Sequence, residues 1–250
     1  MSGHSKWSTI KRKKGAEDAR RGKIFTRIAR DIMVAARDGG GDSGTNPALR
    51  LAIEKARGAN MPKDNIERAI KKGTGELEGG NLEEITYEAY GPHGVPILIE
   101  CMTDNRNRAL ADVRRIFNRQ GGNMAEAGAV SWMFDVKGYI AIERTNQDTD
   151  EIFMLAVEAG AEDVEFSDDT IEVYTAATEL HAVSTALSEA GLELSEAQLS
   201  QIPKNEIELG QKDTLQVMGI IDALEELDDV QQVYSGLKIT DAALAELEAA

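Results

Sequence analysis

The cations near the start of the chain carry the clearest chemistry in the sequence. The run Lys11-Arg12-Lys13-Lys14 is flanked by further basic residues at Lys6, Arg20, Arg21, Lys23, Arg27 and Arg30. Closely spaced Lys and Arg side chains bind polyphosphates because each neutralised phosphate releases condensed counterions. Trp7 lies between Lys6 and the run, where its ring either stacks on an unpaired base or anchors this segment on the protein. Together these residues are the predicted nucleic-acid-binding site.

Charge is divided sharply along the chain. The formal net charge is −16, yet residues 1–77 hold 18 Lys and Arg against nine Asp and Glu. The rest of the chain therefore holds 10 basic against 35 acidic residues. A chance fluctuation of surface charge is the alternative, but the segregation favours a basic module that binds polyanions. The acidic remainder would limit indiscriminate binding and keep the protein soluble.

A second basic group lies in the middle of the chain and consists only of arginine. Its members are Arg106, Arg108, Arg114, Arg115 and Arg119. The planar guanidinium forms paired hydrogen bonds with phosphate oxygens, which suits a nucleic-acid backbone. The same geometry suits carboxylates, so these arginines either extend the nucleic-acid site, through Arg106, Arg108, Arg115 and Arg119, or pair with the acidic domains.

Nothing in the sequence predicts catalysis, a metal site or a cofactor. His4, His93 and His181 fall in an arm, a turn and a helix, which gives little support for a metal centre or a histidine-based triad. The glycines at 39–44 are not followed by the Gly-Lys-Ser/Thr of a phosphate loop. Acidic pairs such as Asp168-Asp169 and Asp228-Asp229 are typical of solvated turns. We therefore expect a non-enzymatic protein.

Composition predicts a soluble, cytoplasmic protein with aliphatic cores. Apolar residues make up 42% of the chain and charged residues 29%, and no apolar run approaches the length of about 20 residues that a membrane span needs. A basic amphipathic helix can lie on an anionic membrane, but here its apolar side is needed for packing. The single cysteine, Cys101, lies in an apolar run, so it is expected in the core.

The first 77 residues predict a basic arm followed by a small helical domain. The spacing of Ile24, Ile28 and Ile32 predicts a helix over 16–37 with one apolar face. Cations on this helix and just before it recur every seven residues, which places them on one stripe opposite the core: Lys13, Arg20 and Arg27, and Lys23, Arg30 and Arg37. Asn46-Pro47 and Met61-Pro62 predict the starts of two further helices, over 47–58 and 63–72.

The rest of the chain predicts two α+β domains of ferredoxin-like type, one inserted in the other. Strands at 85–90, 95–102 and 130–134 and a helix at 106–120 begin the middle domain, 78–134, which a helix at 212–227 and a strand at 230–235 complete within 206–240. Between them, 135–205 shows the order strand, helix, strand, strand, helix, strand of a split β-α-β-β-α-β unit. Residues 241–250 form an acidic tail.

Several short segments resemble one known family. They are Gly3-His4-Ser5-Lys6-Trp7, Arg21-Gly22-Lys23-Ile24-Phe25, Asn60-Met61-Pro62, Tyr90-Gly91-Pro92 and Asp104-Asn105-Arg106-Asn107-Arg108. Together they resemble the YebC family of bacterial regulators and its mitochondrial translational-activator relatives. The resemblance runs nearly end to end and is most specific over 3–133. Within 135–205 it rests mainly on Gly160-Ala161-Glu162-Asp163-Val164.

The resemblance implies a three-domain fold with a cleft and a DNA-binding transcriptional regulator of a bacterial cytoplasm. Members of the family are also linked to translation, including relief of ribosomes stalled on proline-rich stretches. Two functions therefore stay open: a transcription regulator that binds promoter DNA, and a ribosome-associated factor that binds ribosomal RNA or tRNA. Both use the basic N-terminal segment, and the residues specify phosphate without specifying the polymer.

Overall fold

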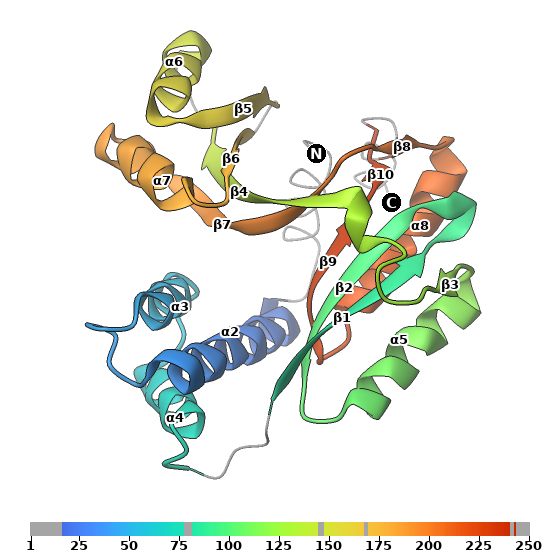
Figure 1. Cartoon of the computed structure of the whole chain (residues 1–250), viewed down its shortest axis with the longest axis horizontal. Helices are drawn as coiled ribbons and strands as arrows, with labels where there is room; N and C mark the ends of the chain where they lie inside the picture. The colour runs from blue at the N-terminus through green and yellow to red at the C-terminus, as the bar shows by residue number, and fades with distance from the viewer. Residues whose placement is uncertain (1–16, 78–81, 145–147, 168–169, 241–242, 244–250) are drawn as a thin grey trace.

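The computed structural model describes residues 17–77, 82–144, 148–167, 170–240 and 243, with 17–21 described by their backbone alone. It confirms the predicted α+β class, with a helical N-terminal part followed by two antiparallel four-stranded sheets. Each part has its own hydrophobic core. Figure 1 shows the helical part and the second α+β part on the same side of the middle sheet.

Three helices form the N-terminal part: α2 (Glu17–Gly39), α3 (Pro47–Gly58) and α4 (Lys63–Gly73). Ile28 and Ile32 of α2 pack against Leu49 of α3 and Ile66 of α4, all of them buried. α3 begins where the sequence predicts, because the side-chain oxygen of Asn46 accepts a hydrogen bond from the Leu49 amide at 3.1 Å. The apolar face of α2 is narrower than predicted, since Ile24 is 44% exposed.

The middle part is a sheet with two helices on one face. Its strands run in the order β3-β1-β2-β9, with every neighbouring pair antiparallel. The bounds are β1 (Glu83–Tyr90), β2 (Pro96–Thr103), β3 (Asn123–Met124) and β9 (Val230–Ser235), with α5 (Arg106–Gln120) and α8 (Gln211–Glu225). A 3-10 turn, η1 (Pro92–Gly94), joins β1 to β2. The short strands β8 (Ile207–Glu208) and β10 (Leu237–Lys238) pair in parallel beside it.

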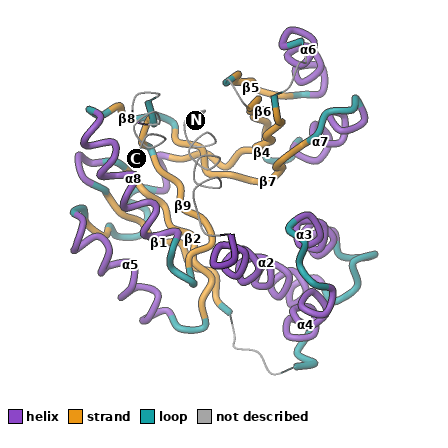
Figure 2. The backbone as a smooth tube through the Cα atoms, turned by 180° about the vertical axis from the view of Figure 1, so that it is seen from behind, coloured by secondary structure: helices purple, strands orange, loops and turns teal. Residues whose placement is uncertain are grey.

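The third part lies between α5 and α8 in the chain and is ferredoxin-like. Its elements are β4 (Phe134–Glu143), α6 (Thr149–Ala159), β5 (Ala161–Phe166), β6 (Thr170–Ala176), α7 (Leu180–Glu189) and β7 (Leu194–Pro203). The sheet order is β5-β6-β4-β7. Ile140, Ile142, Ile171 and Val173 pack against α6 and α7 on one face. Figure 2 shows both helices on the outer side, so the other face is turned toward the middle sheet.

One predicted strand is wrong. Residues 130–133 form a bend and the 3-10 turn η2 (Ser131–Met133), and β4 starts only at Phe134. The cause is the buried carboxylate of Glu88, which accepts hydrogen bonds from the backbone amides of Gly128 at 2.7 Å, Val130 at 2.5 Å and Ser131 at 2.9 Å. Backbone amides that are bonded to a side chain cannot also form the hydrogen bonds of a sheet. The apolar pattern of residues 130–134 does not reveal this bonding to Glu88.

Candidate nucleic-acid interface

The basic stripe of α2 faces the end of α8 and not open solvent. Lys23 Nζ donates a hydrogen bond to the Glu226 carbonyl at 3.0 Å, and Arg27 Nη2 donates to the Glu225 carbonyl at 2.5 Å. Arg30 Nη1 donates to the Asp228 carbonyl. The last carbonyls of a helix lack intrahelical partners and carry the negative end of the helix dipole. Lys23 and Arg27 therefore neutralise the C-terminal end of α8, and Arg30 binds the turn that follows it.

Asp229 joins this contact to the middle sheet. Its buried carboxylate lies 3.0 Å from Arg30 Nη2 and 2.9 Å from Arg108 Nη2, so guanidinium groups from two different parts hold it. Arg108 Nε adds a further hydrogen bond to Asp229 at 3.1 Å, and Arg108 also pairs with Asp104 at 2.8 Å. Hydrogen bonds to Asp229 and then to Asp104 raise the pKa of Arg108 above its ordinary value.

These contacts change how part of the predicted site is understood. Lys23, Arg27 and Arg30 lie on the predicted stripe, but each is hydrogen-bonded to the 225–229 segment and partly buried. Burial lowers the pKa of Arg27 despite the opposing influence of Glu225. Phosphate would have to displace α8 to reach these groups. That Lys23, Arg27 and Arg30 bind phosphate stays a prediction from the sequence.

The rest of the predicted N-terminal site falls outside the described side chains. Lys6, Trp7, Lys11, Arg12, Lys13 and Lys14 lie outside the described residues, and of Arg20 and Arg21 the structure describes only the backbone, within α2. Their role in binding phosphate therefore stays a prediction from the sequence.

The arginines of α5 divide into two sets. Arg108 pairs with Asp229. Of the two predicted roles, binding phosphate or pairing with a carboxylate, the second is the one observed for Arg108. Arg106, Arg115 and Arg119 are exposed. Arg106 lies 3.7 Å from Glu83, and Arg115 lies 3.0 Å from Asp112 one helical turn away. Exposed pairs of this kind contribute little to stability and exchange readily for another anion, so these three arginines stay accessible to phosphate.

Further exposed cations that our sequence analysis did not single out lie on α3 and α4. Arg50, Lys55 and Lys63 are bonded to backbone carbonyls or carboxylates, and the other four are Arg57, Arg68, Lys71 and Lys72. None of the four has an ion pair with another described residue. The signal was present: Arg68, Lys71 and Lys72 stand at i, i+3 and i+4, which places them on one helical face beside the buried Ile66 and Ala69. The helical part thus keeps basic surface on α3 and α4 although its α2 stripe is occupied.

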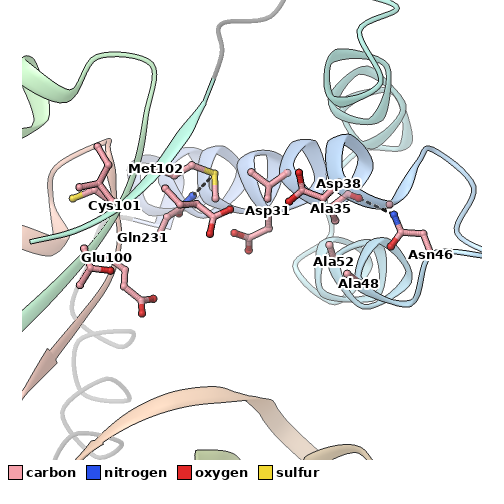
Figure 3. Close-up of a pocket in the computed structure, with 15 residues that line it drawn as sticks. Asp31, Ala35, Asp38, Asn46, Ala48, Ala52, Glu100, Cys101, Met102 and Gln231 are labelled. Carbon is pink, nitrogen blue, oxygen red and sulfur yellow. Dashed lines mark hydrogen bonds between the residues drawn. The ribbon is translucent and has the colours of Figure 1, made fainter. Parts of the chain in front are cut away.

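A cleft between the helical part and the middle sheet has the opposite charge. This cavity of about 680 Å³ is lined by α2, α3, β1 and β2 and contains the carboxylates of Asp31, Asp38, Glu84 and Glu100. Figure 3 shows Asp31 and Asp38 on one wall and Glu100, Cys101 and Met102 on the other. Burial raises the pKa of Asp31, against the attraction of Lys55, and burial likewise raises the pKa of Glu100. The carboxylates of the cleft repel phosphate, which leaves the outer basic surfaces as the candidate site for a polyanion.

Other chemistry finds little support in the described residues. Burial, followed by the charge of Asp229, raises the pKa of the Cys101 thiol to about 12, which leaves it protonated and unreactive, as the expected core position implies. Within the described part of the chain, no three His, Cys, Asp or Glu side chains come together as metal ligands would. No helix among the described residues combines the length and apolarity needed to cross a bilayer.

Comparison with known proteins decides the family. One family model, TACO1/YebC protein N-terminal domain, matches residues 5–76, and a second, TACO1/YebC second and third domain, matches residues 82–237. The chain belongs to the TACO1/YebC family. The predicted resemblance is therefore confirmed, and the two models divide the chain at 77–81, the junction of the helical part with the middle sheet.

Relatives within the TACO1/YebC family are similar over their full length. Proteins named "probable transcriptional regulatory protein" from Acidithiobacillus ferrooxidans and Desulfosudis oleivorans are 56% and 52% identical over 249 and 242 residues. The alignments cover 100% and 97% of this chain and 99% and 98% of the relatives. The crystal structure of the conserved hypothetical protein Aq1575 from Aquifex aeolicus, 44% identical, matches with a TM-score of 0.84 over 90% of this chain and 93% of that one.

Proposed function

We propose that this chain is a nucleic-acid-binding regulator of gene expression, acting as a DNA-binding transcriptional regulator. The observation that carries the proposal is the charge division: 18 basic against nine acidic residues in 1–77, within a chain whose net charge is −16. Relatives at more than 50% identity are named as probable transcriptional regulatory proteins, which supports a regulator.

The position of the cations favours binding through the sugar-phosphate backbone. Basic groups on α3, on α4 and on the exposed side of α5 lie outside the acidic cleft, and the arm adds five cations without a single acidic residue in 1–16. Contacts of this kind position a protein on nucleic acid without reading bases. Sequence preference would then come from the shape of the polymer or from Trp7.

The alternative is a ribosome-associated translation factor that binds ribosomal RNA or tRNA. Its support is that the accessible cations are divided between the helical part and α5 of the middle part. Folded RNA offers phosphates at several angles, so separated basic surfaces can be used together more readily than on a straight duplex. The acidic third part would then orient the protein by repulsion from RNA.

Binding measurements on the full chain test the proposal. Promoter fragments and scrambled duplexes are compared by fluorescence anisotropy at equal salt, with ribosomal RNA fragments in parallel. A DNA-binding regulator binds promoter fragments more tightly than scrambled duplex. Equal and weak binding to both duplexes, with co-sedimentation on ribosomes at moderate salt, would favour the translation factor.

A matched variant locates the binding site on the arm. Changing Lys11, Arg12, Lys13 and Lys14 together to Ala is expected to weaken binding to every sequence and to flatten its salt dependence. Unchanged affinity would move the site off the arm.

A further inference from the structure

The sheet β5-β6-β4-β7 of the third part has one face that packs on α6 and α7 and an opposite face, called here the inner face. This inner face combines carboxylates with tyrosines. Residues directly opposite each other in a sheet share a face, so the register aligns two rows across the strands. One row runs Glu165, Glu172, Ala141, Glu196, and the next runs Asp163, Tyr174, Tyr139, Gln198. The apolar partners of α6 and α7 are on the other face. The inner face is therefore acidic and aromatic at once.

Two polar side chains of the inner face, those of Glu172 and Tyr174, are buried, which is unusual for a carboxylate and a tyrosine hydroxyl. Glu172 is only 1% exposed and Tyr174 only 4%, although α6 and α7 pack on the opposite side. Tyr139 donates a hydrogen bond to Glu172 at 2.7 Å, and its ring centroid lies 5.8 Å from that of Tyr174. The buried Tyr174 hydroxyl has no hydrogen-bond partner among the described residues. Burial and then the charges of Glu172 and Glu165 raise the pKa of Tyr174.

A surface of this composition suits a flexible segment rich in Lys and Arg. Carboxylates in a row attract several cations at once, and hydrogen bonds from charged donors to carboxylates are among the stronger ones. Phosphate and acidic partners are excluded by charge. The residues 135–205 that contain the face carry 16 acidic against three basic residues, which extends the same preference beyond the rows themselves.

We propose that the inner face of the third sheet is a docking surface for the basic arm of the same chain, residues 1–16. The arm carries five cations and no acidic residue, so its charge complements the face. Sixteen residues reach at most about 55 Å when extended, which exceeds the width of a folded chain of this size. The helix α2 that the arm precedes lies on the same side of the middle sheet as the third part (Figures 1 and 2).

Docking has a consequence that rests on the proposed function. The cations that bind the acidic face are those predicted to bind nucleic acid, so the two partners compete for the arm. Binding within one chain benefits from a high effective concentration, so docking lowers the apparent affinity for every nucleic-acid site by the same factor. The third part then acts as a built-in competitor: at a given protein concentration, weak nonspecific sites lose their occupancy while a tight site stays occupied.

Trypsin cleavage of the full chain tests the docking. A docked arm is cleaved slowly after Lys11 to Lys14 at about 50 mM salt and faster at about 500 mM, because salt screens the pairs. The E165Q/E196Q variant changes two partly exposed carboxylates of the face, and its arm is expected to be cleaved about fivefold faster at low salt. The E151Q/E158Q variant removes the same charge from the exposed side of α6 and is expected to match the unaltered chain.

Two outcomes would overturn the docking. One is an equal arm cleavage rate in all three chains at low salt. The other is protection that appears only at high protein concentration, which would make a second copy the occupant. Anisotropy with a labelled RNA and a labelled duplex separates this proposal from the proposed function. Arm protection without binding of either polymer rejects the function alone, and binding without arm protection rejects the docking alone.

Discussion

Asp229 shows how one side chain connects two parts of the protein. Its neighbour Asp228 is exposed and contributes only its carbonyl to Arg30, whereas the Asp229 carboxylate is buried between Arg30 and Arg108. Sequence alone does not separate the two, since a pair of aspartates after a helix is typical of a solvated turn. The difference lies in side-chain direction, which depends on how α2 and α5 pack.

Changing Asp229 to Asn is expected to destabilise the protein by about 2 kcal/mol, because the largely buried Arg30 loses its carboxylate, while the half-exposed Arg108 loses a solvent-screened pair and adds little. The measurement is the free energy of unfolding in urea. Asp228→Asn is the matched control and should change stability by less than about 0.5 kcal/mol, because the carbonyl that Arg30 uses is retained. Equal effects of the two changes would contradict the role given to the buried carboxylate.

The free energy of unfolding is expected to depend on pH through the Glu88 carboxylate. Burial opposes its ionisation, but hydrogen bonds from the amides of Gly128, Val130 and Ser131 prevail and lower its pKa. A lowered folded-state pKa adds stability above the unfolded-state value of about 4.3, and this stability is lost as pH falls through the folded-state pKa. Glu88→Gln should cost about 2 kcal/mol at pH 7, and the difference from the unaltered chain should shrink toward pH 3. Urea unfolding at several pH values measures it, and a constant difference would contradict it.

At the level of elements, α2 and α4 approach so closely that one position requires glycine. A Cβ at Gly73 would lie 2.3 Å from the Met33 carbonyl oxygen and 2.8 Å from the Ala36 Cβ. Gly73→Ala is therefore expected to destabilise the helical part by about 1–3 kcal/mol through overpacking. Gly58→Ala at the end of α3 meets nothing within 4 Å and is the control, expected to be neutral or slightly stabilising. Local amide exchange in α2 and α4 measures both, and similar effects would contradict the close packing.

Local elements were predictable where one segment carries its own signal. The start of α3 follows from Asn46, and the hairpin of β1 and β2 follows from two strand-like apolar segments on either side of Gly91-Pro92. The bend at 130–133 was not predictable, because its cause, Glu88, lies more than 40 residues earlier. The two-residue strands β3, β8 and β10 are too short to carry a period.

The sequence predicts which cations form the candidate site, but it does not predict which of them are free to bind phosphate. Seven-residue spacing places the α2 cations on one stripe, yet the partners of Lys23 and Arg27 are about 200 positions away in the chain. A basic stripe that binds phosphate and one that binds the carbonyl end of a helix have the same sequence pattern, since both need cations on one face. Only the packing of α8 separates them.

On the scale of the whole molecule, a basic part and an acidic remainder are joined through contacts that use some of the cations. Lys23, Arg27 and Arg30 bind the 225–229 segment, while the four basic groups on α3 and α4 and the arginines of α5 other than Arg108 stay exposed. The number of phosphates neutralised should therefore be smaller than the number of basic residues in 1–77. The salt dependence of binding reports that number, with a slope of about −0.9 per phosphate contact on duplex DNA.

Two double variants with the same charge change test whether the cations that bind the 225–229 segment differ from those that bind phosphate. Lys13→Gln with Lys14→Gln should weaken nucleic-acid binding and reduce the salt slope by nearly two, because both cations are predicted to meet phosphate. Arg27→Gln with Arg30→Gln should leave the slope nearly unchanged, since these side chains bind the 225–229 segment. It should instead raise amide exchange at the end of α8 and in the turn after it, where the donors to the Glu225 and Asp228 carbonyls are lost. If the Arg27 and Arg30 pair reduced the slope as much as the lysine pair, phosphate would have to displace α8, and the contact would open on binding.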